Sequence, residues 1–194
     1  MAADLPPLVV VASERAERYS YEHSPIPEVG RLLSVLTAHL PAPARVLEIG
    51  TGTGVGTAWI ASGALPRADI SVITLERNQS LAAIASYGAS EGLWPEFVKF
   101  GVGDVLEILS DSEPFDLIFA NAPAGKYRGL DLTIAALKPG GLLIVDDMTV
   151  APESTWGHDR KESVRQALLF HPQLTAVELQ HGSGVILATR RPAS

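Results

Sequence analysis

Residues 46–56 read VLEIGTGTGVG, and this stretch decides how the fold of the chain is interpreted. A short apolar run that carries Glu48 leads into four glycines at alternate positions, and the helix-forming stretch TAWIASGA follows. The four glycines are Gly50, Gly52, Gly54 and Gly56. Glycine is required where the backbone turns with φ > 0 or where a ligand lies against bare main chain. The order predicts a buried strand, a glycine-rich turn and a helix whose free N–H groups favour an anionic group.

The number and spacing of these glycines narrow the class of ligand. A tight turn without a ligand needs one or two glycines, whereas this turn has four within seven residues. The dinucleotide fingerprint G-x-G-x-x-G requires its third glycine at position 55 or 57. Those positions hold Val55 and Thr57, so the fingerprint is absent. We expect a ligand-binding turn whose ligand is not a nicotinamide dinucleotide, with a purely structural turn as the plain alternative.

The composition is typical of one soluble α/β domain. Of 194 residues, 46% are hydrophobic and 19% are charged, which suits a full core and argues against disorder. A net charge of -7 without any block of Lys or Arg argues against nucleic-acid binding. The absence of cysteine excludes disulfides and thiolate metal sites. With no apolar run of roughly 18 residues and no basic start of a signal peptide, we expect a cytoplasmic protein without membrane contact.

Five apolar segments alternate with helical segments along the chain. The predicted strands are residues 45–50, 70–76, 97–104, 115–121 and 142–147, followed by a hairpin of residues 174–180 and 184–190. Strands that are apolar almost throughout are typical of a parallel sheet covered on both faces. We therefore predict an α/β fold with a doubly wound, Rossmann-like sheet. It is mostly parallel with a C-terminal antiparallel hairpin, and helices lie on both faces.

The helices are expected between these strands. They cover residues 29–40, the stretch after the glycine turn to about residue 64, and residues 77–92, 105–109, 129–141 and 159–170. Residues 1–23 are predicted to be an N-terminal lid or assembly segment, with a short helix that Ser13 is able to cap. Residues 24–194 then form a single domain.

Polar residues end the five predicted strands. They are Glu48 with Gly50, Glu76, Asp104, Asn121 and the pair Asp146 and Asp147. Ligands of doubly wound sheets bind beyond the carboxyl ends of the strands, so these residues predict a site at that edge. A helix cap is the alternative for any one of them, because Asp and Asn favour that position.

Two of these carboxylates indicate the class of ligand. Glu76 lies 26 residues after Gly50, close to the spacing at which an acid binds a ribose diol. Asp104 follows the third strand and is able to accept a hydrogen bond from an exocyclic adenine amine. Together with the glycine turn, they predict an adenosine-bearing ligand that lies across the strand ends.

Seven motifs along residues 24–191 carry a family resemblance. They are PEVGRLL, RVLEIGTGTGVG, ITLERN, VGDVLEIL, FDLIFANA, ALKPGGLLIVDDM and GVILATRR. With them the chain resembles the class I S-adenosylmethionine-dependent methyltransferases, and most closely the catechol and caffeoyl-coenzyme A O-methyltransferase family. The glycine motif is typical of the whole class, whereas KPGGLLIVDDM after FDLIFANA is typical of this family. The resemblance implies a methyltransferase with S-adenosyl-L-methionine as cofactor.

The resemblance also implies a set of cofactor-binding residues. They are Glu48, Gly50, Thr51, Gly52, Thr53 and Gly54 at the methionine end, Glu76 and Arg77 at the ribose, Gly103, Asp104 and Val105 at the adenine, and Asn121. Ser24 and Pro25 match a segment that closes over the cofactor. The family usually has Ser where this chain has Gly56, so we expect one cofactor contact to be missing.

Many members of this family bind a divalent metal through an Asp after strand four and an Asp-Asn pair after strand five. At the matching positions this chain has Asn121, Asp146 and Asp147. Two carboxylates and one amide oxygen are acceptable ligands for Mg²⁺, which prefers oxygen. The resemblance therefore implies a Mg²⁺ site at these three residues, with its acidic groups redistributed.

The family also has a lysine three residues after its strand-four Asp, which is thought to act as a base. A gapless count from Asn121 reaches Ala124, and Lys126 lies two residues further on. The same gapless count keeps Tyr127 in register with the family's tyrosine. Lys126 is therefore a candidate catalytic residue that requires a gap in the match.

The segment after the fifth strand supplies another candidate base. His158 lies beside Trp156 and Asp159, and histidine titrates near neutrality. A surface histidine beside a helix cap is its plain alternative. Asp146 is a third catalytic candidate, through the metal, and Trp156 with Tyr127 would suit the walls of an aromatic pocket.

The leading prediction is an enzyme that transfers a methyl group from S-adenosylmethionine to an oxygen of a small molecule, and we expect a homodimer. One alternative is metal-independent transfer to nitrogen or carbon, which the missing strand-four Asp favours. Another is a non-catalytic protein that binds S-adenosylmethionine or S-adenosylhomocysteine, which the altered metal and lysine positions suggest. The sequence does not indicate which acceptor is used.

Overall fold

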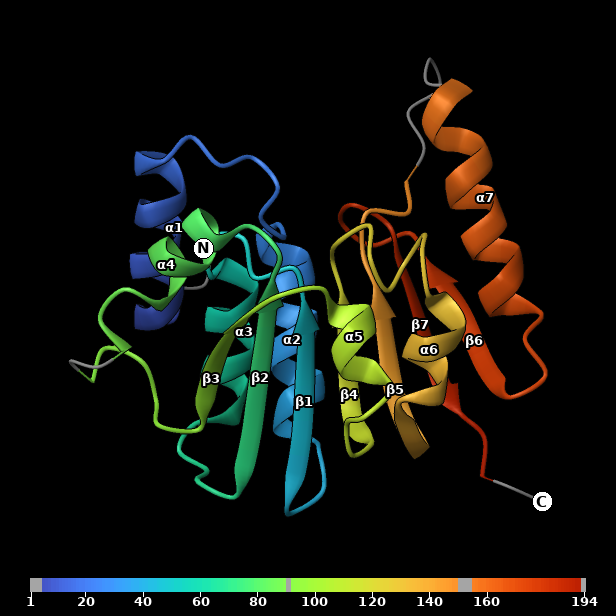
Figure 1. Cartoon of the computed structure of the whole chain (residues 1–194), viewed down its shortest axis with the longest axis horizontal. Helices are drawn as coiled ribbons and strands as arrows, with labels where there is room; N and C mark the ends of the chain where they lie inside the picture. The colour runs from blue at the N-terminus through green and yellow to red at the C-terminus, as the bar shows by residue number, and fades with distance from the viewer. Residues whose placement is uncertain (1–4, 90–91, 150–154, 193–194) are drawn as a thin grey trace.

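Seven strands form one sheet at the centre of the molecule (Figure 1). The strands are β1 Ala44–Ile49, β2 Ile70–Glu76, β3 Val98–Val102, β4 Phe115–Ala120, β5 Leu137–Val145, β6 Leu174–Leu179 and β7 Val185–Arg190. Their order is β3-β2-β1-β4-β5-β7-β6, with β1 to β5 parallel and β7 antiparallel to both of its neighbours. This structure, a computed structural model, describes residues 5–89, 92–149 and 155–192. The predicted fold class is confirmed.

Seven helices flank the sheet in the described part of the chain. They are α1 Pro7–Arg18, α2 Pro27–Ala38, α3 Val55–Ala64, α4 Gln79–Ser86, α5 Val105–Leu109, α6 Leu130–Ala135 and α7 Thr155–Leu169. Buried residues of α1, α2 and α3 pack in one hydrophobic cluster with the sheet, and those of α5, α6 and α7 pack in another. In Figure 1, α5 and α6 lie in front of the sheet and α2 and α3 behind it. None of the described helices combines the length and the apolar character needed to cross a membrane.

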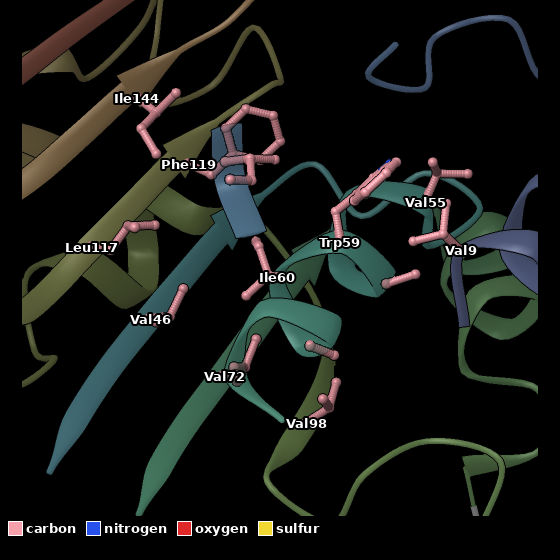
Figure 2. Close-up of a cluster of buried hydrophobic side chains, with 14 of the residues drawn as sticks. Val9, Val46, Val55, Trp59, Ile60, Val72, Val98, Leu117, Phe119 and Ile144 are labelled. Carbon is pink, nitrogen blue, oxygen red and sulfur yellow. The ribbon is translucent and has the colours of Figure 1, made fainter. Parts of the chain in front are cut away.

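Alternate residues of each central strand enter the two clusters. Val46 of β1 and Phe119 of β4 point to the cluster of α1 to α3, while Leu47 and Ile118 point to the other. Figure 2 shows Trp59 of α3 between the side chains of the strands and those of α1. Full burial of one such side chain contributes about 1.5–3 kcal/mol to folding. This two-sided packing holds the strand ends rigidly in place.

The predicted helix over residues 129–141 was too long. It ends at Ala135, and β5 begins at Leu137. Leu137 is fully buried and pairs with Phe115 of β4, whose N–H donates to the Ala136 carbonyl over 2.8 Å. This strand pairing, together with Pro139, which cannot continue a helix, overrides the local helical pattern.

Other helix boundaries also differ from the prediction, most clearly those of α4 and α1. α4 covers only Gln79–Ser86 of the predicted residues 77–92, and the Asn78 side chain caps it by accepting from Ser80 N and Leu81 N. α1 begins at Pro7, so Ser13 lies within the helix and does not cap it. Proline is well suited to the first helical position, because the N–H it lacks would have no intrahelical partner there.

The parallel register aligns the carboxyl ends of the central strands. Ile49 of β1 pairs with Leu75 of β2 and with Ala120 of β4, and Ala120 pairs with Val145 of β5. The residues that follow these four positions are Gly50, Glu76, Asn121 and Asp146. They therefore meet at one edge of the sheet, as the sequence predicts.

Candidate active site

The glycine turn joins β1 to α3 and exposes bare main chain at that edge. Gly50, Gly52 and Gly54 have φ of 97°, 55° and 92°, a left-handed region that residues with a Cβ rarely adopt. Gly54 is the N-cap of α3 and supplies no side-chain capping bond. The first N–H groups of α3 therefore have neither an intrahelical partner nor a side-chain cap. This geometry favours an anionic group above the turn.

Glu48 lies beneath the turn and is only 1% exposed. One of its carboxylate oxygens, Oε2, accepts hydrogen bonds from the hydroxyl groups of Thr57 and Thr74, the latter over 2.7 Å. The other, Oε1, is buried without a partner in the described residues. Burial raises the pKa of Glu48 to about 7, although the two hydroxyl groups lower it. Glu48 is thus a buried acid with one free oxygen at the base of the glycine turn.

This chain has Gly56 where the family usually has Ser, and the position of Glu48 explains the difference. A Cβ at Gly56 would collide with Glu48 Oε1 and would lie 3.3 Å from Phe119 Cε1. The place that a larger side chain would take is therefore already filled by the carboxyl group. Whether a cofactor contact is lost here stays a prediction.

A cleft of about 970 Å³ opens beside the strand ends. On the side of β1 to β3 its lining includes Gly50, Glu76, Arg77, Gly103, Asp104 and Val105. On the side of β4, β5 and α7 it includes Lys126, Tyr127, Arg128, Leu130, Asp159 and Arg160. Residues from both halves of the sheet therefore share one ligand-sized cleft.

Two carboxylates, those of Glu76 and Asp104, lie on the β1 to β3 side of this cleft. Glu76 accepts from Gly52 N over 3.0 Å and from Asn78 N over 2.9 Å. Asp104 caps α5 by accepting from Leu106 N over 3.1 Å, and its other oxygen accepts from Arg128 over 2.6 Å. The pKa of Asp104 is lowered, first by the Leu106 N–H and then by the charge of Arg128. The Asp104 carboxylate is therefore an ionised acceptor at neutral pH.

Lys126 and Asp146 meet on the second side. Lys126 is only 3% exposed, and its Nζ donates to the Asp146 carbonyl oxygen over 2.9 Å. Burial lowers the pKa of Lys126, while the charges of Asp147 and Asp146 act in the opposite direction. The amine lies 4.9 Å from the centre of the Tyr127 ring. The structure thus brings the predicted Lys126 to the cleft and to Asp146, although it follows Asn121 by five residues.

The carboxylates of Asp146 and Asp147 already interact with hydrogen-bond donors of the protein itself. Asp146 is 2% exposed and accepts from its neighbour's N–H over 2.6 Å and from the Ser183 hydroxyl. Burial raises the pKa of Asp146. Asp147 has φ of 59°, which Asp and Asn tolerate best, and its carboxylate pairs with Lys161 over 2.9 Å.

The predicted metal ligands were tested against this arrangement. Within residues 5–89, 92–149 and 155–192, no three His, Cys, Asp or Glu side chains group as metal ligands. Lys126 presents N–H donors beside Asp146, whereas Mg²⁺ requires oxygen ligands. Lys161 pairs with the Asp147 carboxylate over 2.9 Å, and Lys126 donates to the main-chain carbonyl of Asp146. As arranged, this donor set does not fit a resident divalent cation.

Comparison with known proteins identifies the family. The profile of a family described as a methyltransferase domain matches residues 47–148, more than half of the chain. The chain belongs to this methyltransferase family. A relative from Mycolicibacterium vanbaalenii, an O-methyltransferase by name, is 32% identical over 174 residues, which cover 84% of this chain and 76% of the relative.

Solved methyltransferase structures share the whole fold. The O-methyltransferase TomG of Streptomyces achromogenes, solved with S-adenosylmethionine, has a TM-score of 0.82 at 22% identity, over 99% of this chain and 93% of that chain. Cofactor-bound Rv0187 of MTB has a TM-score of 0.82 at 25% identity, over 100% and 94%. The agreement over both chains shows that the shared fold extends beyond residues 47–148 to the rest of the chain.

The glycine turn of this methyltransferase fits an adenosylated amino acid. Three buried polar atoms near it have no hydrogen-bond partner in the described residues: Glu48 Oε1, Thr53 Oγ1 and Ser24 Oγ. Buried polar groups are normally paired, so unpaired atoms at a bare turn indicate a polar ligand. Thr51 is satisfied by Thr74, with 2.6 Å between their hydroxyl oxygens, and serves to fix the turn.

Several predicted residues do not line the large cleft, and Pro25, His158 and Asn121 are among them. Pro25 lines a separate hollow of about 330 Å³ with Ser24 and residues of α1 and α3. His158 lies on α7, and 59% of its side chain is exposed. The next residue, Asp159, lines the cleft, whereas His158 does not. Asn121 is partly buried, and its N–H donates to the Ile49 carbonyl over 3.0 Å. Residues 150–154 and the Trp156 side chain lie outside the described residues, so the predicted aromatic wall is tested only at Tyr127.

Sequence reasoning missed several residues that shape the site. Arg15 of α1 donates to the Thr53 carbonyl of the glycine turn over 3.1 Å, and Tyr21 lies against Gly52. Arg128 closes the ion pair with Asp104. Each of these contacts joins residues at least 24 positions apart, and no local pattern predicts them.

Proposed function

We propose that this methyltransferase transfers the methyl group of S-adenosylmethionine to an oxygen of a small hydroxylated acceptor, without a divalent metal. The observation that carries the proposal is the buried Lys126 amine, which lines the cleft while it is held on the Asp146 carbonyl. The Lys126 amine would be a proton acceptor beside Asp146, where the family resemblance implies a metal.

The residues on the β1 to β3 side of the cleft would hold the cofactor. The glycine turn and the start of α3 suit the amino-acid end, and the Glu76 carboxylate suits the ribose diol. Gly103 and Asp104, at the end of β3, border the same cleft and suit the adenine. When bound, S-adenosylmethionine supplies an electrophilic methyl group on a positively charged sulfur.

Lys126 would act on the acceptor. Because burial lowers its pKa, a larger share of its amine is neutral near physiological pH than on the surface. The neutral amine is able to take the proton of the acceptor hydroxyl, which increases the charge on the attacking oxygen. Asp146 orients the amine through its main-chain carbonyl and is therefore a positioning residue.

The walls of the cleft indicate a small acceptor. Tyr127 and Leu130 come from the segment after β4, and Val164 comes from α7. These apolar groups suit the body of a ring or short chain, and positioning within such a cleft supplies much of the rate of methyl transfer. The homodimer, the cytoplasmic location and the lack of nucleic-acid binding stay predictions from the sequence.

Transfer of a labelled methyl group tests this proposal. The purified protein is incubated with methyl-tritiated S-adenosylmethionine and a panel of phenols, catechols, carboxylic acids and amines, and products are identified by mass spectrometry. We expect an O-methylated product. Products methylated only on nitrogen or carbon would contradict the proposal, and so would tight S-adenosylhomocysteine binding without any product across the panel.

A further inference from the structure

Tyr21 lies against the glycine turn, although it belongs to the segment between α1 and α2. A Cβ at Gly52 would lie 2.7 Å from both Cε1 and the hydroxyl oxygen of Tyr21. The backbone of Tyr21 is fixed because its N–H donates to the Ala16 carbonyl over 2.9 Å. Its ring meets the His23 ring edge-to-face, with 5.6 Å between centroids. The phenol is thus held over the second glycine of the turn by α1 and by its own segment.

The contact depends on glycine at position 52. Any other residue would bring a side chain into the Tyr21 ring and would strain a backbone with φ of 55°. Arg15 supports the same turn by donating to the Thr53 carbonyl over 3.1 Å and to the Ala85 carbonyl over 3.2 Å. The segment 15–21 therefore contacts the glycine turn at two consecutive residues, Gly52 and Thr53.

The Tyr21 hydroxyl is a hydrogen-bond donor in this position. Burial raises the pKa of Tyr21, and the charges of Glu76 and Glu48 raise it further, so the phenol keeps its proton at neutral pH. In the described part of the chain, this hydroxyl makes no hydrogen bond. Thr53 Oγ1 and Glu48 Oε1 are also buried without partners. Three polar atoms around the turn are therefore left without a hydrogen-bond partner among the described residues.

The charges around the turn indicate which ligand group this donor serves. Glu48 and Glu76 favour a cation and oppose an anion, so a ligand carboxylate needs strong donors nearby. The uncapped start of α3 supplies N–H groups, and the Tyr21 hydroxyl supplies one more. An amino-acid end, with an ammonium and a carboxylate, matches this mixture of acceptors and donors.

We propose that Tyr21 is a cofactor-binding residue whose hydroxyl donates to the amino-acid carboxylate of S-adenosylmethionine. The segment between α1 and α2 is then a fixed part of the cofactor site. This inference rests on the cofactor part of the proposed function and is independent of the acceptor and of the metal.

The test compares Tyr21→Phe with Tyr19→Phe, a matched change at a tyrosine that is 54% exposed. Calorimetry measures the affinity of wild type and both variants for three compounds. They are S-adenosylhomocysteine, its decarboxylated form S-adenosyl-3-thiopropylamine, and 5′-methylthioadenosine, which lacks the whole amino-acid end. The melting temperature of each variant confirms that it is folded.

We expect Tyr21→Phe to weaken S-adenosylhomocysteine binding about tenfold, the loss of one hydrogen bond to a charged group. Binding of the two compounds without a carboxylate should stay as in wild type, and Tyr19→Phe should change none of the three. Unchanged S-adenosylhomocysteine affinity in Tyr21→Phe would overturn the proposal, and so would an equal loss for all three compounds. A wild-type protein that does not bind S-adenosylhomocysteine would overturn the proposed function as well.

Discussion

The two halves of the cleft are built in different ways. On the side of β1 to β3, neighbouring backbone positions two carboxylates, Glu76 through Asn78 and Asp104 through Leu106, while Arg15 and Arg128 add contacts from distant parts of the sequence. On the side of β4 and β5, the key groups are positioned by distant residues: Asp146 by Lys126 and Ser183, which are 20 and 37 positions away. The cofactor half is therefore encoded partly by local backbone geometry, whereas the acceptor half depends mainly on the tertiary structure.

This difference has a chemical consequence. An adenosine-bearing cofactor can be bound by a local geometry of strand, turn and helix. The acceptor half instead has two lysines beside the Asp146–Asp147 pair: Lys126 donates to the main-chain carbonyl of Asp146, and Lys161 pairs with the Asp147 carboxylate. Changes in that half should alter turnover and leave cofactor affinity intact, while changes in the first half should do the reverse.

The largest effect is expected for Lys126→Met. Loss of the proton acceptor should lower kcat by about 10²- to 10⁴-fold, while S-adenosylhomocysteine affinity stays as in wild type. Methionine keeps the length of the buried chain, so the fold should survive. Lys99→Met, at an exposed lysine of β3, is the matched control. A loss of cofactor affinity in Lys126→Met would break the proposed division between the halves.

The next effect concerns Glu48 and the stability of the ligand-free protein. With a pKa of about 7 in the folded state against 4.5 when unfolded, Glu48 keeps its proton between these values only in the folded protein. The free energy of unfolding should therefore fall as pH rises from about 4.5 to about 7, by about 3 kcal/mol in total, and level off above.

Glu48→Gln should remove this part of the pH dependence. Urea unfolding of both proteins from pH 4.5 to 8 measures the difference between their profiles, and Glu113→Gln, at an exposed carboxylate, serves as control. Parallel profiles for wild type and Glu48→Gln would show that Glu48 is ionised in the folded protein throughout this range.

A smaller effect is expected for Glu76→Gln. The charged acceptor for the ribose diol is lost while the shape is kept, so S-adenosylhomocysteine affinity should fall about tenfold. Calorimetry measures it, with Glu107→Gln on the exposed side of α5 as control. Since Glu76 belongs to the cofactor half, kcat at saturating cofactor should change little, and a large loss of kcat would argue against the division.

The smallest effect is expected for Arg128→Ala, which removes an ion pair between the two halves. The Arg128 and Asp104 side chains are 57% and 26% exposed, so solvent screens the pair. Stability should fall by less than about 1 kcal/mol, as measured by thermal unfolding beside Arg18→Ala. A larger loss would mean that solvent screens this ion pair less than its exposure indicates.

The sequence predicts the sheet and its strand ends well, and physical reasons limit the rest. Strand ends such as Glu76 are visible because apolar runs stop there. Leu137 looks helical locally, but its pairing with Phe115 makes it a strand. The partners of Asp146 and the contact of Tyr21 with Gly52 depend on residues brought together only by folding. Local patterns cannot report such contacts.

The most direct test of the central claim is the rate of methyl transfer with and without a divalent metal. The accepted substrate from the labelled panel is assayed after dialysis against EDTA, and again with added Mg²⁺ or Mn²⁺. Because Lys126 serves the acceptor in place of a metal, we predict the same rate in all three conditions. A rate that is lost with EDTA and restored by either metal would contradict the account.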